Sequence, residues 1–302
     1  MRTPYEQIVD VQAIGRKNPL AVNHLFDLAA KEFVPPAAHD EEKILVIGID
    51  VQNDFMETGE LAVPGSHQDV HNFTRFIYSN LNRITRIAVS LDTHQPLQIF
   101  HPAWWGNAAH EAPKPFTLIT LADIDAGTWV PRYAPRDSRD YVANLESSGR
   151  KQLVIWPYHC LQGTFGGSLE GQFSNLVYFH SAVRQSELLR IVKGEDVLSE
   201  MYGIIKPEYD KNGYMNRELL DELLKYDKIF IGGEAKSHCV LESLVQIVEH
   251  FHDVPSLTQK IYLLEDCMSN IPGFERATEE TLQNVSEQYG VHRVPMSANL
   301  LV

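Results

Sequence analysis

A carboxylate, an amine and a thiol that together could carry out acyl transfer stand far apart in the sequence, at Asp50, Lys193 and Cys239. Cys239 follows an apolar run that ends in two glycines, and it begins an amphipathic segment that extends to about residue 252. We expect the dipole and the unpaired N–H groups of a helix N-terminus to stabilise its thiolate, with a base and a cation beside it. Taken singly, Cys239 could equally be a small buried apolar residue, and Asp50 a residue that only turns the chain.

A second set of residues has the types expected of a metal site. Asp92 and His94 are two residues apart, and His159 lies in a distant loop. A carboxylate with imidazoles that leaves coordination positions open suits a catalytic divalent metal. In the loop that follows, His101 is a better candidate for a fourth ligand than His110. An Asp-x-His pair alone is a weak signal, and this donor set fits zinc, iron and manganese alike.

Short apolar runs that end in polar residues position both sets. The run 44–49 is too short for a helix and is typical of a strand buried on both faces, with Asp50 directly after it. Five further runs are interpreted as strands, at 85–91, 189–193, 228–233, 261–266 and 291–294. Segments with helical character lie between them, at about 68–82, 169–188, 239–252 and 275–289.

This alternation predicts an α/β fold, a doubly wound and mostly parallel six-stranded sheet with helices on both faces. Ligands bind such sheets in the crevice outside the carboxyl ends of the strands. We therefore expect Asp50 and Lys193 to end adjacent parallel strands and to share one crevice with Cys239.

The chain is expected to divide into an N-terminal extension, residues 1–42, and a core domain, residues 43–302. The extension contains a helical segment at 23–33 and ends in a linker of two prolines followed by acidic residues. A long insertion in the core, at about 101–152, shows no regular period and is expected to be a lid, another functional loop or a subunit contact. Its Trp104 and Trp105 are interpreted as packing or subunit-contact residues rather than substrate walls.

Composition excludes several classes of function. The 302 residues are 44% hydrophobic and 22% charged, which suits a soluble globular protein. The net charge of -14 and the lack of a basic cluster argue against a nucleic-acid partner. No apolar stretch approaches the roughly 18 residues of a membrane span, and residues 1–19 have no signal-peptide core. The lack of such a span predicts no membrane partner. Three cysteines are too few for a disulfide framework, which predicts a reducing, cytoplasmic location.

Five separated motifs, taken together, resemble those of a known family. They are Asp50-x-Gln52-x-Asp54-Phe55, Asp92-x-His94, Trp156-Pro-x-His159-Cys160, Lys193 at a strand end, and Gly233-x-Ala235-x-x-x-Cys239-Val240. In this order they are similar to the motifs of the nicotinamidases, a branch of the isochorismatase-like cysteine hydrolases. The resemblance covers roughly residues 43 to 296.

The resemblance implies a role for each matching residue. The catalytic triad would consist of a general base, an orienting cation and a nucleophile, namely Asp50, Lys193 and Cys239. A cis peptide would precede Ala235, and the oxyanion hole would be formed by the backbone N–H groups of Ala235 and Cys239. A pyridine ring would lie between Phe55 and Trp156. A divalent metal, zinc before iron or manganese, would be bound by Asp92, His94 and His159, with His101 as a candidate fourth ligand.

The resemblance therefore predicts a metal-dependent amidohydrolase that converts nicotinamide to nicotinate and ammonia through a cysteine thioester, a reaction of NAD salvage. Glu234 and His238 depart from the family pattern, in which an apolar residue and an aromatic residue or threonine are more usual. Two alternatives stay open: a hydrolase of another small amide, ureide or N-carbamoyl compound, and a non-catalytic binding or scaffold protein. The expected partner is a small-molecule amide, and the chain is expected to form homo-oligomers.

Overall fold

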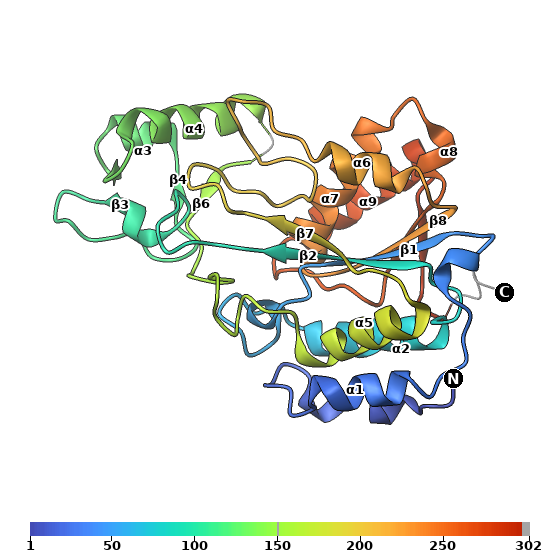
Figure 1. Cartoon of the computed structure of the whole chain (residues 1–302). Coiled ribbons are helices and arrows are strands. Elements are labelled where there is room, and N and C mark those ends of the chain that lie inside the picture. The colour runs from blue at the N-terminus through green and yellow to red at the C-terminus, as the bar shows by residue number, and fades with distance from the viewer. Residues whose placement is uncertain (150, 298–302) are drawn as a thin grey trace.

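A six-stranded parallel sheet forms the centre of this computed structural model, which describes residues 1–149 and 151–297 (Figure 1). The strand order is β10-β9-β8-β1-β2-β7, and each neighbouring pair is parallel. The strands are β1 Ile44–Ile49, β2 Arg86–Asp92, β7 Leu189–Lys193, β8 Lys228–Gly233, β9 Ile261–Leu264 and β10 His292–Val294. The predicted fold class is therefore confirmed.

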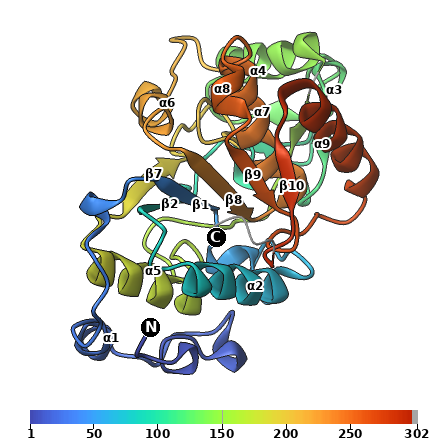
Figure 2. The same cartoon turned by 90° about the vertical axis from the view of Figure 1, so that its right-hand side faces the viewer.

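Helices cover both faces of this sheet, as Figures 1 and 2 show. On one face lie α2 Ser66–Ser79 and α5 Gly171–Arg184, and on the other lie α6 Arg217–Leu223, α7 Leu241–His250 and α9 Glu275–Tyr289; α8 is a single turn, Pro255–Thr258. Side chains alternate along β1, so Ile44 and Val46 join one apolar cluster, and Leu45 and Ile47 join the other. Both faces of β1 are thus buried, which explains its unbroken apolar run.

One expectation about strand neighbours is wrong. β1 and β7 are not adjacent, because β2 pairs with both of them. Lys193 on β7 is the register partner of Asp92 on β2, and the backbone N–H of Asp50 donates to the Ser90 hydroxyl of β2 at 2.9 Å. The end of β2 therefore lies in the crevice between the ends of β1 and β7, which were expected to be neighbours.

The N-terminal extension packs on the α2 and α5 layer (Figure 1). Its helix α1, Val22–Ala29, contacts α5, and the hydroxyl of Tyr5 forms a 2.7 Å hydrogen bond with Thr74 of α2. The extension thus adds a further layer on the face of α2 and α5 that is turned away from the sheet.

The insertion lies beyond the carboxyl end of β2 (Figure 1) and contains more regular structure than its sequence suggested. Its described residues include β3 Trp105–Gly106, β4 Leu118–Ile119, α3 Leu121–Asp125, β5 Val130–Pro131 and α4 Pro135–Ser148. β3 pairs with β5, and β4 pairs with β6 Leu153–Val154, which directly follows the insertion. The indoles of Trp104 and Trp105 are buried and donate to Ser138 and to the carbonyl of Ile99, which confirms that they are packing residues. Among the described residues, no helix has the length and apolarity that crossing a bilayer requires.

Candidate active site

A buried lysine joins two carboxylates at the carboxyl ends of three strands. Lys193 Nζ lies 2.9 Å from Asp50 Oδ2 and 3.1 Å from Asp92 Oδ1, and it donates to the carbonyl of Met201 at 3.0 Å. All three charged side chains are almost inaccessible to solvent. Burial disfavours the ammonium, but Asp50 and Asp92 hold the pKa of Lys193 well above its usual value. The lysine therefore keeps its positive charge.

The carboxylate of Asp50 is fixed by the neighbouring strand. The Ser90 hydroxyl donates a short hydrogen bond to Asp50 Oδ1. The residue has a φ of 47°, a left-handed conformation that aspartate tolerates better than most residues as the chain leaves β1. Burial raises the pKa of Asp50, and the positive charge of Lys193 opposes that rise. A carboxylate with a raised pKa is better able to accept and hold a proton.

Cys239 lies within reach of the same lysine. It belongs to a π-helical turn, Lys236–Val240, that leads into α7, and its Sγ is 3.7 Å from Lys193 Nζ. Burial raises the pKa of the thiol well above its usual value, the carboxylates of Asp50 and Asp92 raise it further, and Lys193 lowers it. Burial thus opposes ionisation of the sulfur and the lysine favours it, and a thiolate stabilised by the helix terminus with a base and a cation beside it stays a prediction.

Three of the four expected metal ligands form a compact buried cluster. The potential ligand atoms of Asp92, His94 and His159 all lie within 4.8 Å of one another. Asp92 Oδ2 is 2.8 Å from His94 Nε2 and 3.6 Å from His159 Nε2. His101 is not part of this cluster, and its ring centroid is 5.9 Å from that of His94. Its role as a fourth ligand stays a prediction.

The cluster fits a divalent transition metal. His94 Nδ1 lies 3.1 Å from the carbonyl of Gly194, and His159 Nδ1 lies 2.8 Å from that of Pro157. A carbonyl can only accept, so each Nδ1 carries a hydrogen, and each Nε2 faces Asp92 as the ring atom that would bind a metal. Although burial opposes it, the charges of His94 and Lys193 hold the pKa of Asp92 well below its usual value, which keeps the carboxylate ionised. One anionic oxygen donor with two imidazoles is a suitable donor set.

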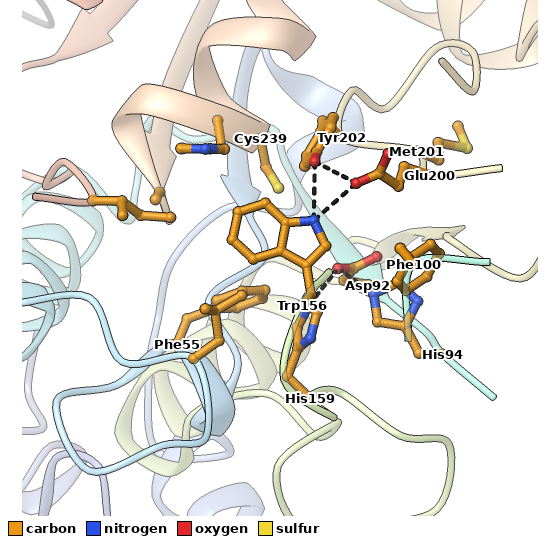
Figure 3. Close-up of a pocket in the computed structure, with 14 residues that line it drawn as sticks. Phe55, Asp92, His94, Phe100, Trp156, His159, Glu200, Met201, Tyr202 and Cys239 are labelled. Atoms are coloured by element: carbon orange, nitrogen blue, oxygen red, sulfur yellow. Dashed lines mark hydrogen bonds and ion pairs between the residues drawn. The ribbon is translucent and has the colours of Figure 1, made fainter. Parts of the chain in front are cut away.

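A pocket lies between the cysteine and the metal-type cluster (Figure 3). Its lining includes both expected ring-binding residues, Phe55 and Trp156, and both residues of the expected oxyanion hole, Ala235 and Cys239. The peptide between Glu234 and Ala235 is cis, as the resemblance implies. The structure thus brings Cys239, the three-residue cluster and the aromatic residues to one pocket, and Lys193 contacts Cys239 and Asp92 from behind the pocket lining.

Known proteins share this arrangement of strands and helices. No family model matches the chain. Curated nicotinamidases of Saccharomyces cerevisiae and Escherichia coli are 22% identical over 209 residues and 23% identical over 215 residues, covering 68% and 70% of this chain and 82% and 78% of the relatives. The chain is therefore similar in sequence to these nicotinamidases.

Solved nicotinamidase structures agree with this relationship at the level of fold. A nicotinamidase and pyrazinamidase from Acinetobacter baumanii superimposes with a TM-score of 0.58 at 20% identity, over 87% of this chain and 100% of that one. The yeast nicotinamidase bound to the inhibitor nicotinaldehyde gives a TM-score of 0.57 at 17% identity, over 83% of this chain and 99% of that one.

The pocket also contains a buried acid that the sequence analysis missed. Glu200 Oε1 accepts hydrogen bonds from the indole N–H of Trp156 at 2.8 Å and from the Tyr202 hydroxyl at 2.6 Å (Figure 3). Its Oε2 accepts from the hydroxyl of Tyr141 on insertion helix α4 at 3.0 Å. Burial raises the pKa of Glu200 to about 7. The insertion therefore supports the wall of this pocket, although neither Glu200 nor Tyr141 stands in a recognisable motif.

His238, one residue before the cysteine, also lines the pocket. Its ring packs against those of Trp156 and Phe274, with centroids 5.7 Å and 4.7 Å away. Burial lowers the pKa of His238 to about 4, so the ring is neutral near pH 7. The unusual residue at this position thus contributes an uncharged aromatic surface and not a cation.

Proposed function

We propose that this chain hydrolyses nicotinamide to nicotinate and ammonia through a thioester on Cys239. The observation that carries this proposal is the position of Lys193 Nζ, which contacts Cys239 Sγ, Asp50 Oδ2 and Asp92 Oδ1 at one pocket. A nucleophile, a base and a metal-type cluster are thereby joined by a single cation. The nicotinamidase relatives and the aromatic walls of the pocket support nicotinamide as the amide.

Activation of the cysteine is a proton transfer beside a fixed positive charge. The thiol proton moves to Asp50, so the negative charge moves from the Asp50 carboxylate to the sulfur. Lys193 Nζ lies 2.9 Å from Asp50 Oδ2 and 3.7 Å from Cys239 Sγ. The ammonium therefore stabilises the negative charge both before and after the proton transfer. Asp50 is suited to hold the proton because burial raises its pKa.

The thiolate then attacks the carboxamide carbon and the carbonyl becomes an oxyanion. The backbone N–H groups of Ala235 and Cys239 are proposed to donate to this oxygen. Collapse breaks the C–N bond, and ammonia leaves with the proton returned by Asp50. Water next attacks the thioester while Asp50 takes its proton, the C–S bond breaks, and Cys239 regains a hydrogen.

Asp92, His94 and His159 are the residues that would hold a divalent metal, with zinc proposed before iron or manganese. When bound, such an ion would supply a Lewis acid that anchors the ring nitrogen of the substrate. The protein itself would position the ring between Phe55 and Trp156 and hold Asp92 ionised through Lys193.

The wider setting follows from the chemistry and is also proposed. Nicotinate is a precursor for NAD salvage, and the protein is proposed to act in the cytoplasm. The three cysteines, Cys160, Cys239 and Cys267, are free, as expected in a reducing compartment.

Ammonia release by purified protein tests the proposal. Nicotinamide, pyrazinamide and several N-carbamoyl compounds would be supplied to the wild type and to Cys239→Ala, with Cys267→Ala as a control for loss of a buried thiol outside the pocket. We expect nicotinamide turnover in the wild type and in the control, and a loss on the order of 10³-fold or more in Cys239→Ala. Turnover that survives in Cys239→Ala would overturn the mechanism. Activity on an N-carbamoyl compound alone would retain the nucleophile and change the substrate.

A further inference from the structure

A second pair of buried acids lies behind the turn that carries the cysteine. Glu234 directly follows β8 and is 1% exposed, and Asp69 in the first turn of α2 is 6% exposed. The two carboxyl groups are within hydrogen-bonding reach of each other. Neither has a role in the chemistry above, and Glu234 is one of the two departures from the family pattern.

The described residues provide too few donors for two carboxylates here. Both side-chain oxygens of Glu234 and Asp69 Oδ2 are buried without a hydrogen-bond partner in the described chain. Ser269 faces both acids, and Asp266, Glu57 and the buried thiol Cys267 are the other titratable groups nearby. Neither acid forms an ion pair with a lysine, arginine or histidine in the part of the chain that the structure describes. Two uncompensated charges would be unfavourable in such a site.

One proton resolves this arrangement. Two carboxylates have only acceptor oxygens and cannot form a hydrogen bond with each other. When one of them is protonated, its O–H group can donate to the other. Asp69 lies at the N-terminus of the 14-residue helix α2, where the helix dipole favours the anion, so the proton belongs on Glu234. Consistent with this assignment, burial raises the pKa of Asp69 to about 6 and that of Glu234 well above its usual value.

The pair lies where it can fix the turn that presents the pocket atoms. The N–H of Gly233 donates to the carbonyl of Cys267 at 2.9 Å, and that of Lys236 to the carbonyl of Ser269 at 2.8 Å. The carbonyl of Ala235 in turn accepts from the N–H groups of His238 and Val240, at 3.0 and 3.2 Å. The segment from β8 to Cys239 is thus joined to the loop after β9, and Glu234 adds an interaction with Asp69 of α2.

We propose that Glu234 and Asp69 share one proton and act as a positioning pair that holds Ala235 and Cys239 in place at the pocket. The shared proton lets two acids stay buried without a cation. Neither residue touches the reacting atoms, so both act through the turn. The consequence for catalysis rests on the proposed amidase activity, whereas the shared proton does not.

Thermal unfolding as a function of pH tests the pair without any substrate. The folded pKa of Glu234 is raised above the 4.5 of a free glutamate, so the folded state holds a proton that the unfolded chain releases. Stability from this proton is fully present below pH 4.5 and is lost as pH rises through the folded pKa. We therefore expect the Tm of the wild type to fall as the pH rises above 4.5 toward the folded pKa of Glu234. Glu234→Gln keeps an N–H donor at every pH and should show a smaller fall, whereas Glu234→Ala should have a lower Tm throughout.

Steady-state kinetics on the same variants test the positioning role. We expect Glu234→Ala to lower kcat by about tenfold or more with a smaller change in KM, because the turn carrying the nucleophile shifts. Glu234→Gln should rescue most of kcat, and Glu60→Gln, an exposed control, should match the wild type in both assays.

The outcomes separate this proposal from the proposed function. An equal loss of Tm with rising pH in the wild type and in Glu234→Gln would overturn the shared proton. A Glu234→Gln variant as impaired as Glu234→Ala in Tm and kcat would overturn the positioning role. A wild type without amidase activity would refute the proposed function, and the unfolding curves would still decide on the pair.

Discussion

Two pairs of buried carboxylates lie close to the ends of the central strands, and they are balanced in different ways. Asp50 and Asp92 flank the ammonium of Lys193 at 2.9 and 3.1 Å. Asp69 and Glu234 have no ion-pair partner among the described residues, and we infer a shared proton. Both arrangements keep acids inside the protein, but the first does so with a permanent charge and the second with a hydrogen that pH can remove.

The difference matches what each region must do. A fixed cation can stabilise a negative charge that moves from Asp50 to Cys239, so the first pair is able to support chemistry. A shared proton holds two groups together but has no charge to offer a substrate, so the second pair is suited to fixing a turn. Buried acids in one protein can thus serve reaction or position according to their compensating partner.

Removing the cation should have the largest effect. In Lys193→Met the carboxylates of Asp50 and Asp92 would lose their common partner while a side chain of similar length fills the space. We expect amidase activity to fall on the order of 10³-fold or more, as for other members of catalytic units. We also expect the free energy of unfolding to fall by roughly 3–5 kcal/mol, since buried charge is left unpaired. Ammonia release and urea denaturation would measure the two effects.

Lys225→Met is the matched control for this substitution. Lys225 is exposed, and the ion pair that it forms among the described residues is with Glu222, so its loss should change stability by no more than about 1 kcal/mol. If Lys193→Met unfolds at the same urea concentration as this control, the burial of Asp50 and Asp92 does not depend on Lys193. The contrast between the two pairs of acids would then be refuted.

Metal binding should sharpen the comparison, because only the first pair lies beside imidazoles. We expect His159→Gln to weaken zinc affinity by about 100-fold or more, since one of three clustered ligands is lost. His110→Gln, an exposed histidine in the insertion, should bind as the wild type does. Titration of metal-free protein with zinc, followed by calorimetry, measures both, and His101→Gln in the same series tests the predicted fourth ligand. Unchanged affinity in His159→Gln would remove the metal site from the first region.

Strands were predictable where a short apolar run ends in a polar residue or glycine, as in the buried β1 and β8 and in the partly exposed edge strand β7. The strands predicted at 44–49, 189–193 and 228–233 have those same bounds in the structure. Residues at the ends of such runs, Asp50 and Lys193 among them, could be assigned to the pocket edge for the same reason. Strand order was not predictable in this way, because chain order does not say that β2 pairs with both β1 and β7.

Residues that reach the site through irregular segments could not be found from periodicity. Helix α4 buries Tyr141, Val142 and Leu145, yet most of its other positions are polar and the insertion around it is irregular. Glu200 lies in a loop after β7, where spacing carries no information about burial. Glu234 was noticed as unusual in the sequence, but only the fold shows Asp69 opposite it.

The smallest expected effect concerns Glu200, whose buried carboxyl group is stabilised neither by a cation nor by a second acid. Its carboxyl is surrounded by three neutral donors, from Trp156, Tyr202 and Tyr141, and burial raises its pKa to about 7. Above pH 7 the anion accepts charge-assisted hydrogen bonds, and below pH 7 the protonated acid holds the Trp156 indole more weakly. We therefore expect KM for nicotinamide to rise as pH falls through 7, with little change in kcat.

Glu200→Gln should reproduce the protonated state at every pH. The amide oxygen can accept from the Trp156 indole, and the amide nitrogen can donate to Tyr141, but the charge is gone. A difference of about 1 kcal/mol between charged and neutral hydrogen bonds corresponds to roughly a fivefold higher KM at pH 8. The variant should also lose the pH dependence of KM near 7. If the pH dependence of KM near 7 persists in Glu200→Gln, another group titrates there. The negative charge of Glu200 would then not be required to position Trp156.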